Sequence, residues 1–372
     1  IMRLTQERSI PCFPAFTVKK MAESEQIAER DFLWSLPVDG IATTIPGPPF
    51  KLKGTPHTLR SLPPELGQHN QDLETLSEAL SPEEPRPHLG LQKSMPLTGI
   101  RVLDLGQVVS IPHCGRLLAW MGADVIHVES SARLTTRNNP PFAYDKPGPN
   151  TSGMYNALGS GKKSCTLNLT TPEGVELFKQ LVEMSDVVLE NFGGRTMNRF
   201  GLGYETLNEL NPGIIMVSLS AFGRTGPMQN YVGMHSAANL FSGVADVTGY
   251  DANDRPRILG TVLPDPFSGT ASCLAILEAL YYRKKSGQGQ HIDLSMSEAF
   301  ANIIPEAFAE HSQTRRRLAP IGNRDAYSAP HGVYRCKGGD HWVAIAIDNE
   351  VEWTALCSVI AQPHLSRDPR FV

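Results

Sequence analysis

Short apolar runs separated by amphipathic stretches form the main pattern of the chain between residues 100 and 220. The runs are rich in Val, Ile and Leu, as buried strands are, and they cover residues 100–105, 124–129, 166–169, 186–190 and 213–219. Apolar residues at helical spacing lie between them, over 114–121 and 172–184. Buried strands that alternate with helices pair in parallel and are covered on both faces. The pattern therefore predicts an α/β fold with an open, mainly parallel, Rossmann-like sheet and helices on both faces.

The pattern changes in the last third of the chain. A helix is expected over 265–283, a strand over 290–295 and a second helix over 297–311. An antiparallel hairpin over 334–347 and a helix over 351–360 follow. These last elements predict a small α+β domain after the sheet.

Composition narrows the classes of function. The chain has 372 residues, a net charge of −4 and 41% hydrophobic residues, which predicts a globular protein of several domains. This charge does not favour nucleic acid or an anionic membrane as a partner. The six cysteines are scattered without a CxxC pair or zinc-ligand spacing, and no apolar run is long enough for a membrane helix. We therefore expect a cytoplasmic protein without a metal site.

The predicted strand ends lack the common nucleotide motifs. No GxGxxG follows the first strand, and Gly159-Ser-Gly-Lys-Lys-Ser lacks the Walker spacing and precedes a strand. These features argue against a dinucleotide site and an NTPase. Ligands of open α/β sheets bind at the carboxyl ends of the strands, so we expect recognition in loops 107–112, 130–139 and 191–195.

Asp265 is the main candidate for chemistry. It opens Asp-Pro-Phe-Ser-Gly-Thr at the start of a predicted helix, where backbone N–H groups are expected to keep the carboxylate ionised. Such an aspartate caps a helix or attacks an electrophile. The hexapeptide alone favours the cap, because Asp before Pro is a common helix start.

Several longer motifs after Met95 appear in the order found in family III CoA-transferases, the CaiB/BaiF group. The chain resembles this group over most of residues 96–372. The resemblance rests on Leu103-Asp-Leu-Gly, Met121-Gly-Ala-Asp-Val-Ile-His-Val-Glu, Asp186-Val-Val-Leu-Glu-Asn-Phe, Arg199-Phe-Gly-Leu-Gly-Tyr, Leu210-Asn-Pro, Ser220-Ala-Phe-Gly-Arg-Thr-Gly-Pro, Asp265-Pro-Phe-Ser-Gly and Ser286-Gly-Gln-Gly-Gln.

The resemblance implies that Asp265 is a catalytic nucleophile. In such enzymes the carboxylate attacks an acyl-CoA thioester, and CoA reaches a carboxylic acid acceptor through an aspartyl anhydride and an aspartyl-CoA thioester. Gly269 and the helix start are expected to provide N–H donors for the oxyanion. The resemblance further implies that CoA is a co-substrate, without a tightly bound cofactor. The residues at matching CoA-binding positions are Val108, Arg137, Lys162, Lys163, Asn191, Phe192, Gly193, Thr196 and Arg199.

Two alternatives to CoA transfer remain open. The related α-methylacyl-CoA racemases use a His in a Gly-His-Asp stretch, which corresponds here to Gly233-Met234-His235. Because Met234 takes the His position, and His235 is expected to point elsewhere, racemisation is disfavoured.

The second alternative is a non-catalytic copy that acts as a structural half of a tandem protein. Ser110-Ile-Pro also departs from the formyl-CoA transferase pattern, so formate and oxalate are not supported as substrates.

The start of the chain resembles the C-terminal tail of members of the same family. Residues 9–79 contain Ile10-Pro-Cys, Pro46-Gly-Pro-Pro-Phe-Lys-Leu-Lys-Gly-Thr-Pro and Pro64-Glu-Leu-Gly-Gln-His, which in the family follow the small domain. We expect a fragment of a tandem two-copy protein, or a permuted single copy, with the second copy as an interlocked partner. The expected divisions are a tail at 1–81, a linker at 82–95, a large domain at 96–312 and an incomplete small domain at 313–372. Alone, the chain is expected to expose apolar surface.

Overall fold

The computed structural model describes residues 2–38, 40–58, 95–260 and 262–371. They form two compact units, one of Ile1–Ala245 with Ile258–Arg317 and one of Asp246–Arg257 with Leu318–Val372. The segment predicted as a tail is therefore part of the same unit as the large domain, as far as residue 58. The predicted linker at 82–95 lies outside the described residues except for Met95.

A seven-stranded sheet forms the centre of the first unit, in the order β3-β9-β8-β7-β4-β5-β6. The neighbours from β9 to β6 pair in parallel, and β3 pairs with β9 in the antiparallel direction. The prediction of an α/β fold with a mainly parallel sheet is confirmed. The strands are β3 (Phe50–Leu52), β4 (Arg101–Asp104), β5 (Asp124–Glu129), β6 (Lys163–Thr166), β7 (Val187–Glu190), β8 (Ile215–Ser220) and β9 (His291–Ser295).

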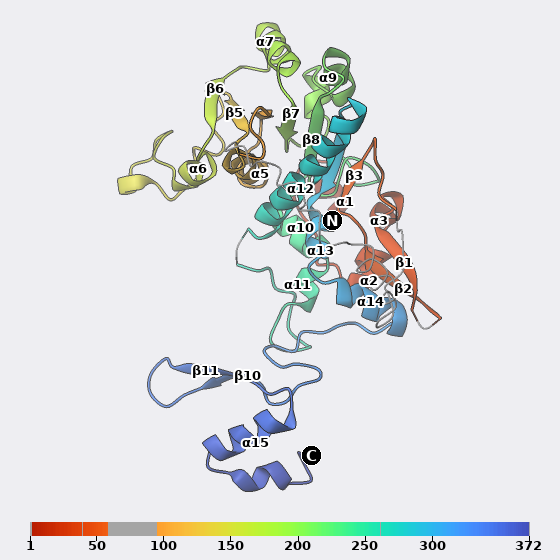
Figure 1. Cartoon of the computed structure of the whole chain (residues 1–372), viewed down its shortest axis with the longest axis vertical. Coiled ribbons are helices and arrows are strands. Elements are labelled where there is room, and N and C mark those ends of the chain that lie inside the picture. Colours follow the sequence, from red (N-terminus) through yellow and green to blue (C-terminus); the bar gives the residue numbers. More distant parts are fainter. Residues whose placement is uncertain (1, 39, 59–94, 261, 372) are drawn as a thin grey trace, which may run out of the picture. The chain divides into compact units, whose positions relative to one another are not determined.

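Helices cover both faces of this sheet because the strand residues alternate between two apolar cores (Figure 1). On one face, Val102, Val187 and Val217 pack with α5 (Ser110–Trp120) and α12 (Pro264–Ser286). On the other face, Leu103 and Val188 pack with apolar residues of the remaining covering helices. These are α7 (Pro172–Glu183), α8 (Thr196–Arg199) and α9 (Tyr204–Leu210).

The chain contains further helices beside those that cover the sheet. They are α6 (Gly153–Leu158), α10 (His235–Phe241), α11 (Val244–Val247), α13 (Met296–Ala301) and α14 (Pro305–Thr314), with a 3-10 turn at η1 (Ala143–Asp145). The single helix predicted over 297–311 is thus two helices, because Pro305 lacks an N–H and begins a new one. The strand predicted over 166–169 lies three residues earlier, at β6.

The N-terminal segment is built into the first unit by one strand and one buried cation. Its elements are α1 (Met2–Gln6), α2 (Val18–Ala22), α3 (Glu25–Glu29), β1 (Leu33–Val38), β2 (Ile41–Pro46) and β3. β3 completes the sheet beside β9, and β1 and β2 form a hairpin that packs on α14. The fully buried Arg30 forms ion pairs with Asp293 of β9 and Glu298 of α13.

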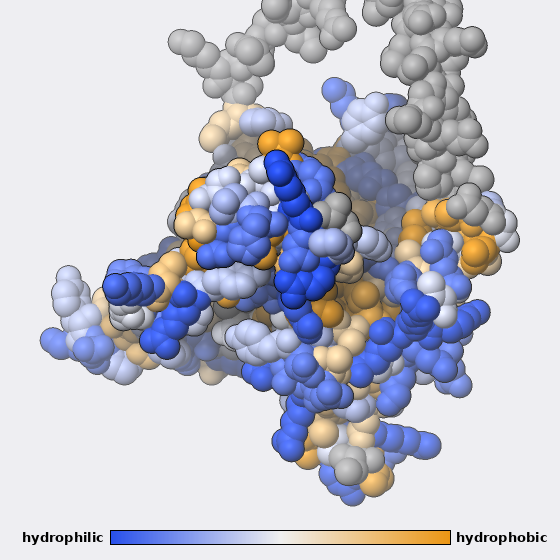
Figure 2. Space-filling view, turned by 90° about the horizontal axis from the view of Figure 1, so that it is seen from below, coloured by the Kyte–Doolittle hydropathy of each residue, from blue (hydrophilic) through white to orange (hydrophobic). Residues whose placement is uncertain are grey.

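The second unit contains a two-stranded hairpin and a helix, as the sequence predicts. The strands β10 (His331–Arg335) and β11 (Trp342–Ala346) are antiparallel, and α15 (Glu350–Val359) and η2 (Pro363–Arg367) follow. Figure 2 shows apolar side chains interspersed among hydrophilic ones on the face that it presents. Large apolar residues of this unit that are exposed include Val333, Tyr334, Trp342, Val343, Val351, Val359 and Ile360. Within the described residues, none of the helices has the length and apolar character needed to cross a membrane.

Candidate active site

Asp265 lies in the first turn of α12 and is only 7% exposed. The residue at the cap position is Leu263, and no side chain caps the helix. The interpretation of Asp265 as a helix cap is therefore wrong. Because the side chain is not needed to begin the helix, its burial at this point calls for another explanation.

The start of α12 does not supply the N–H groups that the sequence led us to expect. Pro264 and Pro266 have no N–H. The N–H groups of Asp265 and Phe267 donate to the carbonyls of Val262 and Leu263. The N–H of Gly269 lies beyond the first four positions of the helix, where N–H groups bond within the helix.

The Asp265 carboxylate instead receives a hydrogen bond from the start of a second helix. The backbone N–H of Ser110, the first residue of α5, donates to it. Gly269 makes this approach possible, because a Cβ at residue 269 would lie only 2.4 Å from the carbonyl oxygen of Ser110. The two helices thus meet with the carboxylate between them.

Burial controls the charge of this carboxylate. It raises the pKa of Asp265 to about 6, although the Ser110 N–H opposes the shift. The N–H groups therefore do not hold the pKa of Asp265 low as expected, yet a group of this pKa is still mostly ionised at pH 7. Asp265 Oδ2 is buried without a hydrogen-bond partner among the described residues. A dry oxygen with a free lone pair is poised for nucleophilic attack.

His235 faces this unpartnered oxygen. Its Nδ1 is 3.7 Å from Asp265 Oδ2, and its side chain is 35% exposed. The expectation that His235 points elsewhere is wrong, because Met234 is in extended conformation and α10 begins only at His235. Strand or helix periodicity therefore does not relate the two side chains. Met234 itself is exposed.

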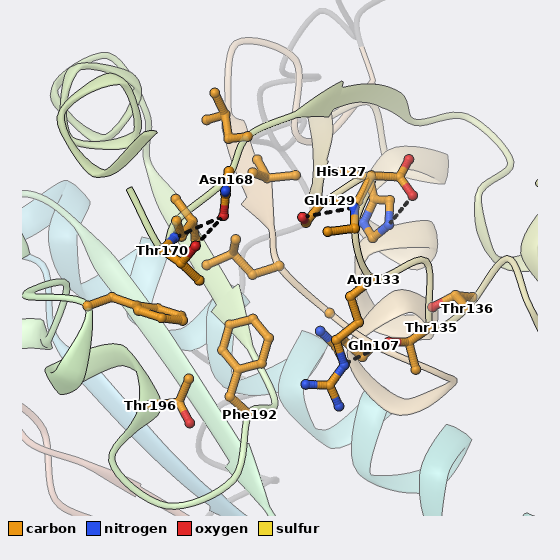
Figure 3. Close-up of a pocket in the computed structure, with 18 residues that line it drawn as sticks. Gln107, His127, Glu129, Arg133, Thr135, Thr136, Asn168, Thr170, Phe192 and Thr196 are labelled. Carbon is orange, nitrogen blue, oxygen red and sulfur yellow. Dashed lines mark hydrogen bonds and ion pairs between the residues drawn. The ribbon is translucent and has the colours of Figure 1, made fainter. Parts of the chain in front are cut away.

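A cavity of about 290 Å³ opens at the carboxyl ends of β4, β5, β6 and β7. Its walls include residues from loops 107–112, 130–139 and 191–195, in which the sequence predicts recognition. In Figure 3, Phe192 and Thr196 lie along one side of the cavity, and Gln107, Arg133 and Thr135 lie along another. Leu167, Leu169 and Phe200 add apolar surface.

Hydrogen bonds connect this cavity to the start of α5. The Asn191 side chain accepts from the N–H of Gln107, and its Nδ2 donates to Gln107 O and to Ser110 Oγ. The N–H of Val108, a residue with φ of 62°, donates to Thr136 Oγ1. The loop that lines the cavity therefore also fixes Ser110 beside Asp265.

The predicted CoA-binding residues fall into two groups. Phe192 and Thr196 line the cavity, whereas Val108, Asn191 and Gly193 belong to the loops that form its rim. The predicted CoA-binding cations differ in whether a carboxylate of this chain already binds them.

Three of the four predicted cations form ion pairs within the chain. Arg137 is held by Glu129 at 2.6 Å. Lys162, whose side chain is 3% exposed, binds Asp104 Oδ2 at 2.7 Å. Lys163 binds Asp124 at 2.6 Å on the surface. Arg199 donates to Thr196 Oγ1 and forms no ion pair within the described residues.

Sequence reasoning did not single out Arg133 and Gln107, although both line the cavity. Arg133 forms no ion pair within the described part of the chain, so its guanidinium is available to an anion. Its place in loop 130–139, after the second predicted strand, was the only signal in the sequence. The hydrogen bond of Gln107 Oε1 with Thr135 links two of the three loops.

Comparison with known proteins identifies the family. Residues 97–372 match the family described as CoA-transferase family III. The succinyl-CoA–D-citramalate CoA-transferase of Chloroflexus aurantiacus is 36% identical over 278 residues, which cover 74% of this chain and 67% of that protein. A probable CoA-transferase of Mycobacterium tuberculosis is 31% identical over 348 residues, which cover 90% of this chain and 41% of that protein.

A solved structure agrees with this match. The crystal structure of a CAIB/BAIF family protein from Brucella suis has a TM-score of 0.68 and 30% identity, and the match covers 75% of this chain and 73% of that one. The chain therefore belongs to CoA-transferase family III and is an enzyme that transfers CoA.

Proposed function

We propose that the enzyme moves CoA from an acyl-CoA thioester to a carboxylic acid, with Asp265 as the nucleophile. The observation that carries this proposal is the state of Asp265 Oδ2, which is buried and lacks a hydrogen-bond partner within the described residues. An oxygen excluded from water attacks a thioester without first losing hydrogen bonds, and the anhydride that it forms is protected from hydrolysis.

The reaction balances without a further reagent. Asp265 Oδ2 attacks the thioester carbonyl, the carbon–sulfur bond breaks, and an aspartyl anhydride and CoA thiolate result. The thiolate attacks the aspartyl carbonyl, which gives an aspartyl-CoA thioester and releases the donor acid. The acceptor carboxylate attacks this thioester and expels the thiolate, and the thiolate then takes the acceptor acyl group and frees Asp265.

We place part of the CoA molecule in the cavity at the strand ends. Its apolar wall, with Phe192 and Leu169, suits the adenine or the pantetheine arm. Arg199 and Arg133 are the cations best placed to bind phosphate, because neither has an ion pair within the described residues. The hydrogen bonds of Asn191 with Gln107, which lines the cavity, and with Ser110, at the start of α5, support this placement.

The substrates that we propose are small organic acids. The Chloroflexus relative is named for succinyl-CoA and D-citramalate, which are a thioester donor and a carboxylate acceptor. We infer the same pairing of classes for this chain, and succinyl-CoA is therefore a suitable probe. Exchange of an α-proton between two bases is not favoured by the site, because 3.7 Å between His235 and Asp265 leaves no room for a carbon between them.

Mass spectrometry after incubation with succinyl-CoA tests the proposal. Trapping with hydroxylamine or borohydride should modify the peptide that contains Asp265 in the wild type and not in Asp265→Asn. Retained transfer in Asp265→Asn, with CoA binding unchanged, would contradict the assignment. Deuterium incorporation at the α-carbon without an adduct would favour racemisation, and neither signal would favour a scaffold role.

We also propose that this chain works beside a second family copy. The match to the longer Mycobacterium protein covers 90% of this chain, so the order of the N-terminal segment and the large domain is found within one longer chain. The exposed apolar residues of the second unit, such as Trp342, suit such a contact. Size-exclusion chromatography with light scattering tests this, and a stable monomer with full activity would contradict it.

A further inference from the structure

The tetrahedral adducts of this reaction carry a negative oxygen, and the first two N–H groups within α12 are already engaged. The two prolines lack N–H groups, and the N–H groups of Asp265 and Phe267 donate to carbonyls. The N–H of Ser110 is already bonded to the Asp265 carboxylate. An oxyanion that lacks a donor would lose a large part of the rate, because such donors contribute about 10²- to 10³-fold each.

His235 is positioned to be such a donor. Its Nδ1 lies 3.7 Å from Asp265 Oδ2, beyond the distance of a direct hydrogen bond. The oxyanion of an adduct is attached to the carbon that Oδ2 attacks, two bonds from Oδ2. A donor at the distance of Nδ1 therefore reaches an atom at this position. The partial exposure of the ring leaves it open to a ligand.

We propose that His235 is a catalytic residue that donates a hydrogen bond from Nδ1 to the oxyanion formed when Asp265 Oδ2 attacks an acyl-CoA. This inference rests on the proposed function of Asp265 as nucleophile. It assigns a role to a side chain for which the sequence indicated none. No proton is transferred in this role, so the balance of the reaction is unchanged.

The charge of the ring agrees with hydrogen-bond donation. Burial lowers the pKa of His235, which favours the neutral imidazole. A neutral ring with its proton on Nδ1 donates to the oxyanion without forming a strong ion pair with Asp265. An imidazolium would instead stabilise the free carboxylate and weaken it as a nucleophile.

Three variants of His235 separate donation from other roles. The amide nitrogen of Asn lies near the Nδ1 position, that of Gln lies near Nε2, and Leu has no donor. We expect single-turnover acylation of Asp265 by succinyl-CoA to slow about 10²- to 10³-fold in His235→Leu and His235→Gln. His235→Asn should stay within about tenfold of the wild type, and the dissociation constant of CoA should change little in all three.

Met234→Leu is the matched control, because Met234 is the exposed neighbour in the chain. Unfolding midpoints and CoA binding show whether each variant is folded. Equal loss in His235→Asn and His235→Leu would overturn donation in favour of proton transfer, which Asn cannot perform. A His235→Leu rate equal to that of Met234→Leu would also overturn it. If the wild type itself forms no adduct at Asp265, the proposed function fails instead.

Discussion

Gly269 of α12 lies directly against the carbonyl oxygen of Ser110, at the first residue of α5. A Cβ at residue 269 would be 2.4 Å from this oxygen, which is closer than real Cβ contacts allow. The same Ser110 donates its N–H to Asp265, one turn earlier on α12. The absence of a side chain at residue 269 therefore determines how closely α5 approaches Asp265.

Gly269→Ala should lower both stability and activity. Within a helix, Gly to Ala alone usually stabilises by up to about 1 kcal/mol. Here the methyl group must displace the backbone of α5, which we expect to cost about 1–3 kcal/mol. The displacement also removes the Ser110 N–H from Asp265, so acylation by succinyl-CoA should slow at least about tenfold. Urea unfolding and trapping of the acyl adduct measure the two effects.

Gly260→Ala serves as the control, because a Cβ at Gly260 meets no atom of the described residues within 4 Å. It should leave both quantities close to the wild-type values. A Gly269→Ala variant with unchanged acylation would show that the hydrogen bond from Ser110 is not needed.

The raised pKa of Asp265 predicts a stability cost for an ionised nucleophile. Burial raises this pKa from 3.8 to about 6. The contribution of the Asp265 carboxyl group to the free energy of unfolding is therefore fully present below pH 3.8. It is lost as the pH rises through about 6, and the loss is about 3 kcal/mol. Asp265→Asn removes the charge, so it should be more stable than the wild type at pH 8 and similar to it at pH 4.

Urea unfolding of both proteins between pH 4 and 8 gives this difference directly. The rate of acylation by wild-type enzyme should rise with pH through about 6, because the proposed nucleophile is the ionised carboxylate. A difference in stability that does not change with pH would contradict the assigned burial of the charge.

The buried Arg30 predicts how the N-terminal segment is held. Its guanidinium pairs with Asp293 and Glu298, and burial raises the pKa of Glu298 to about 7 despite this partner. Arg30→Met leaves the two carboxylates buried without their cation, which should cost about 3–5 kcal/mol. The loss should be larger at pH 8 than at pH 6, because the stability contribution of a raised carboxyl pKa is lost as the pH rises through it.

Limited proteolysis of Arg30→Met should cut within residues 2–58 sooner than in the wild type. Arg3→Met is the control, since the Arg3 side chain is 86% exposed and its ion pair is with Glu7, just after the end of α1. Exposed pairs of this kind contribute less than about 0.5 kcal/mol. Equal stability of the two variants would mean that the buried ion pairs do not hold the segment.

Sequence reasoning found most strands of the sheet and singled out Asp265, because both show as local features. Buried strands such as β7 show as apolar runs, and Asp265 is part of a contiguous motif. The reach of His235 to Asp265 depends on the turn into α10 and on the packing of α10 with α12, neither of which local periodicity determines. Local patterns likewise do not show that the Ser110 N–H donates a hydrogen bond to Asp265.

The predicted CoA-binding Arg and Lys residues also show that local sequence patterns do not reveal tertiary contacts. Arg137 and Lys162 occupy matching motif positions, but each forms an ion pair, with Glu129 and Asp104, that helix or strand periodicity does not indicate. A basic residue in a motif therefore indicates a phosphate contact only where tertiary structure leaves it without an ion pair. This condition separates Arg199 and Arg133 from the others within the described residues.

Lys162 and Arg199 should consequently respond differently to loss of charge. Lys162→Met leaves Asp104, which is fully buried, without its cation, so unfolding should become easier by about 3–5 kcal/mol. Arg199→Met should change stability by less than about 0.5 kcal/mol but weaken CoA binding about tenfold, because a charged contact to phosphate is lost. Isothermal titration with CoA and urea unfolding distinguish the two. If Lys162→Met keeps its stability and loses CoA affinity while Arg199→Met binds normally, Lys162 is the phosphate ligand and Arg199 is not.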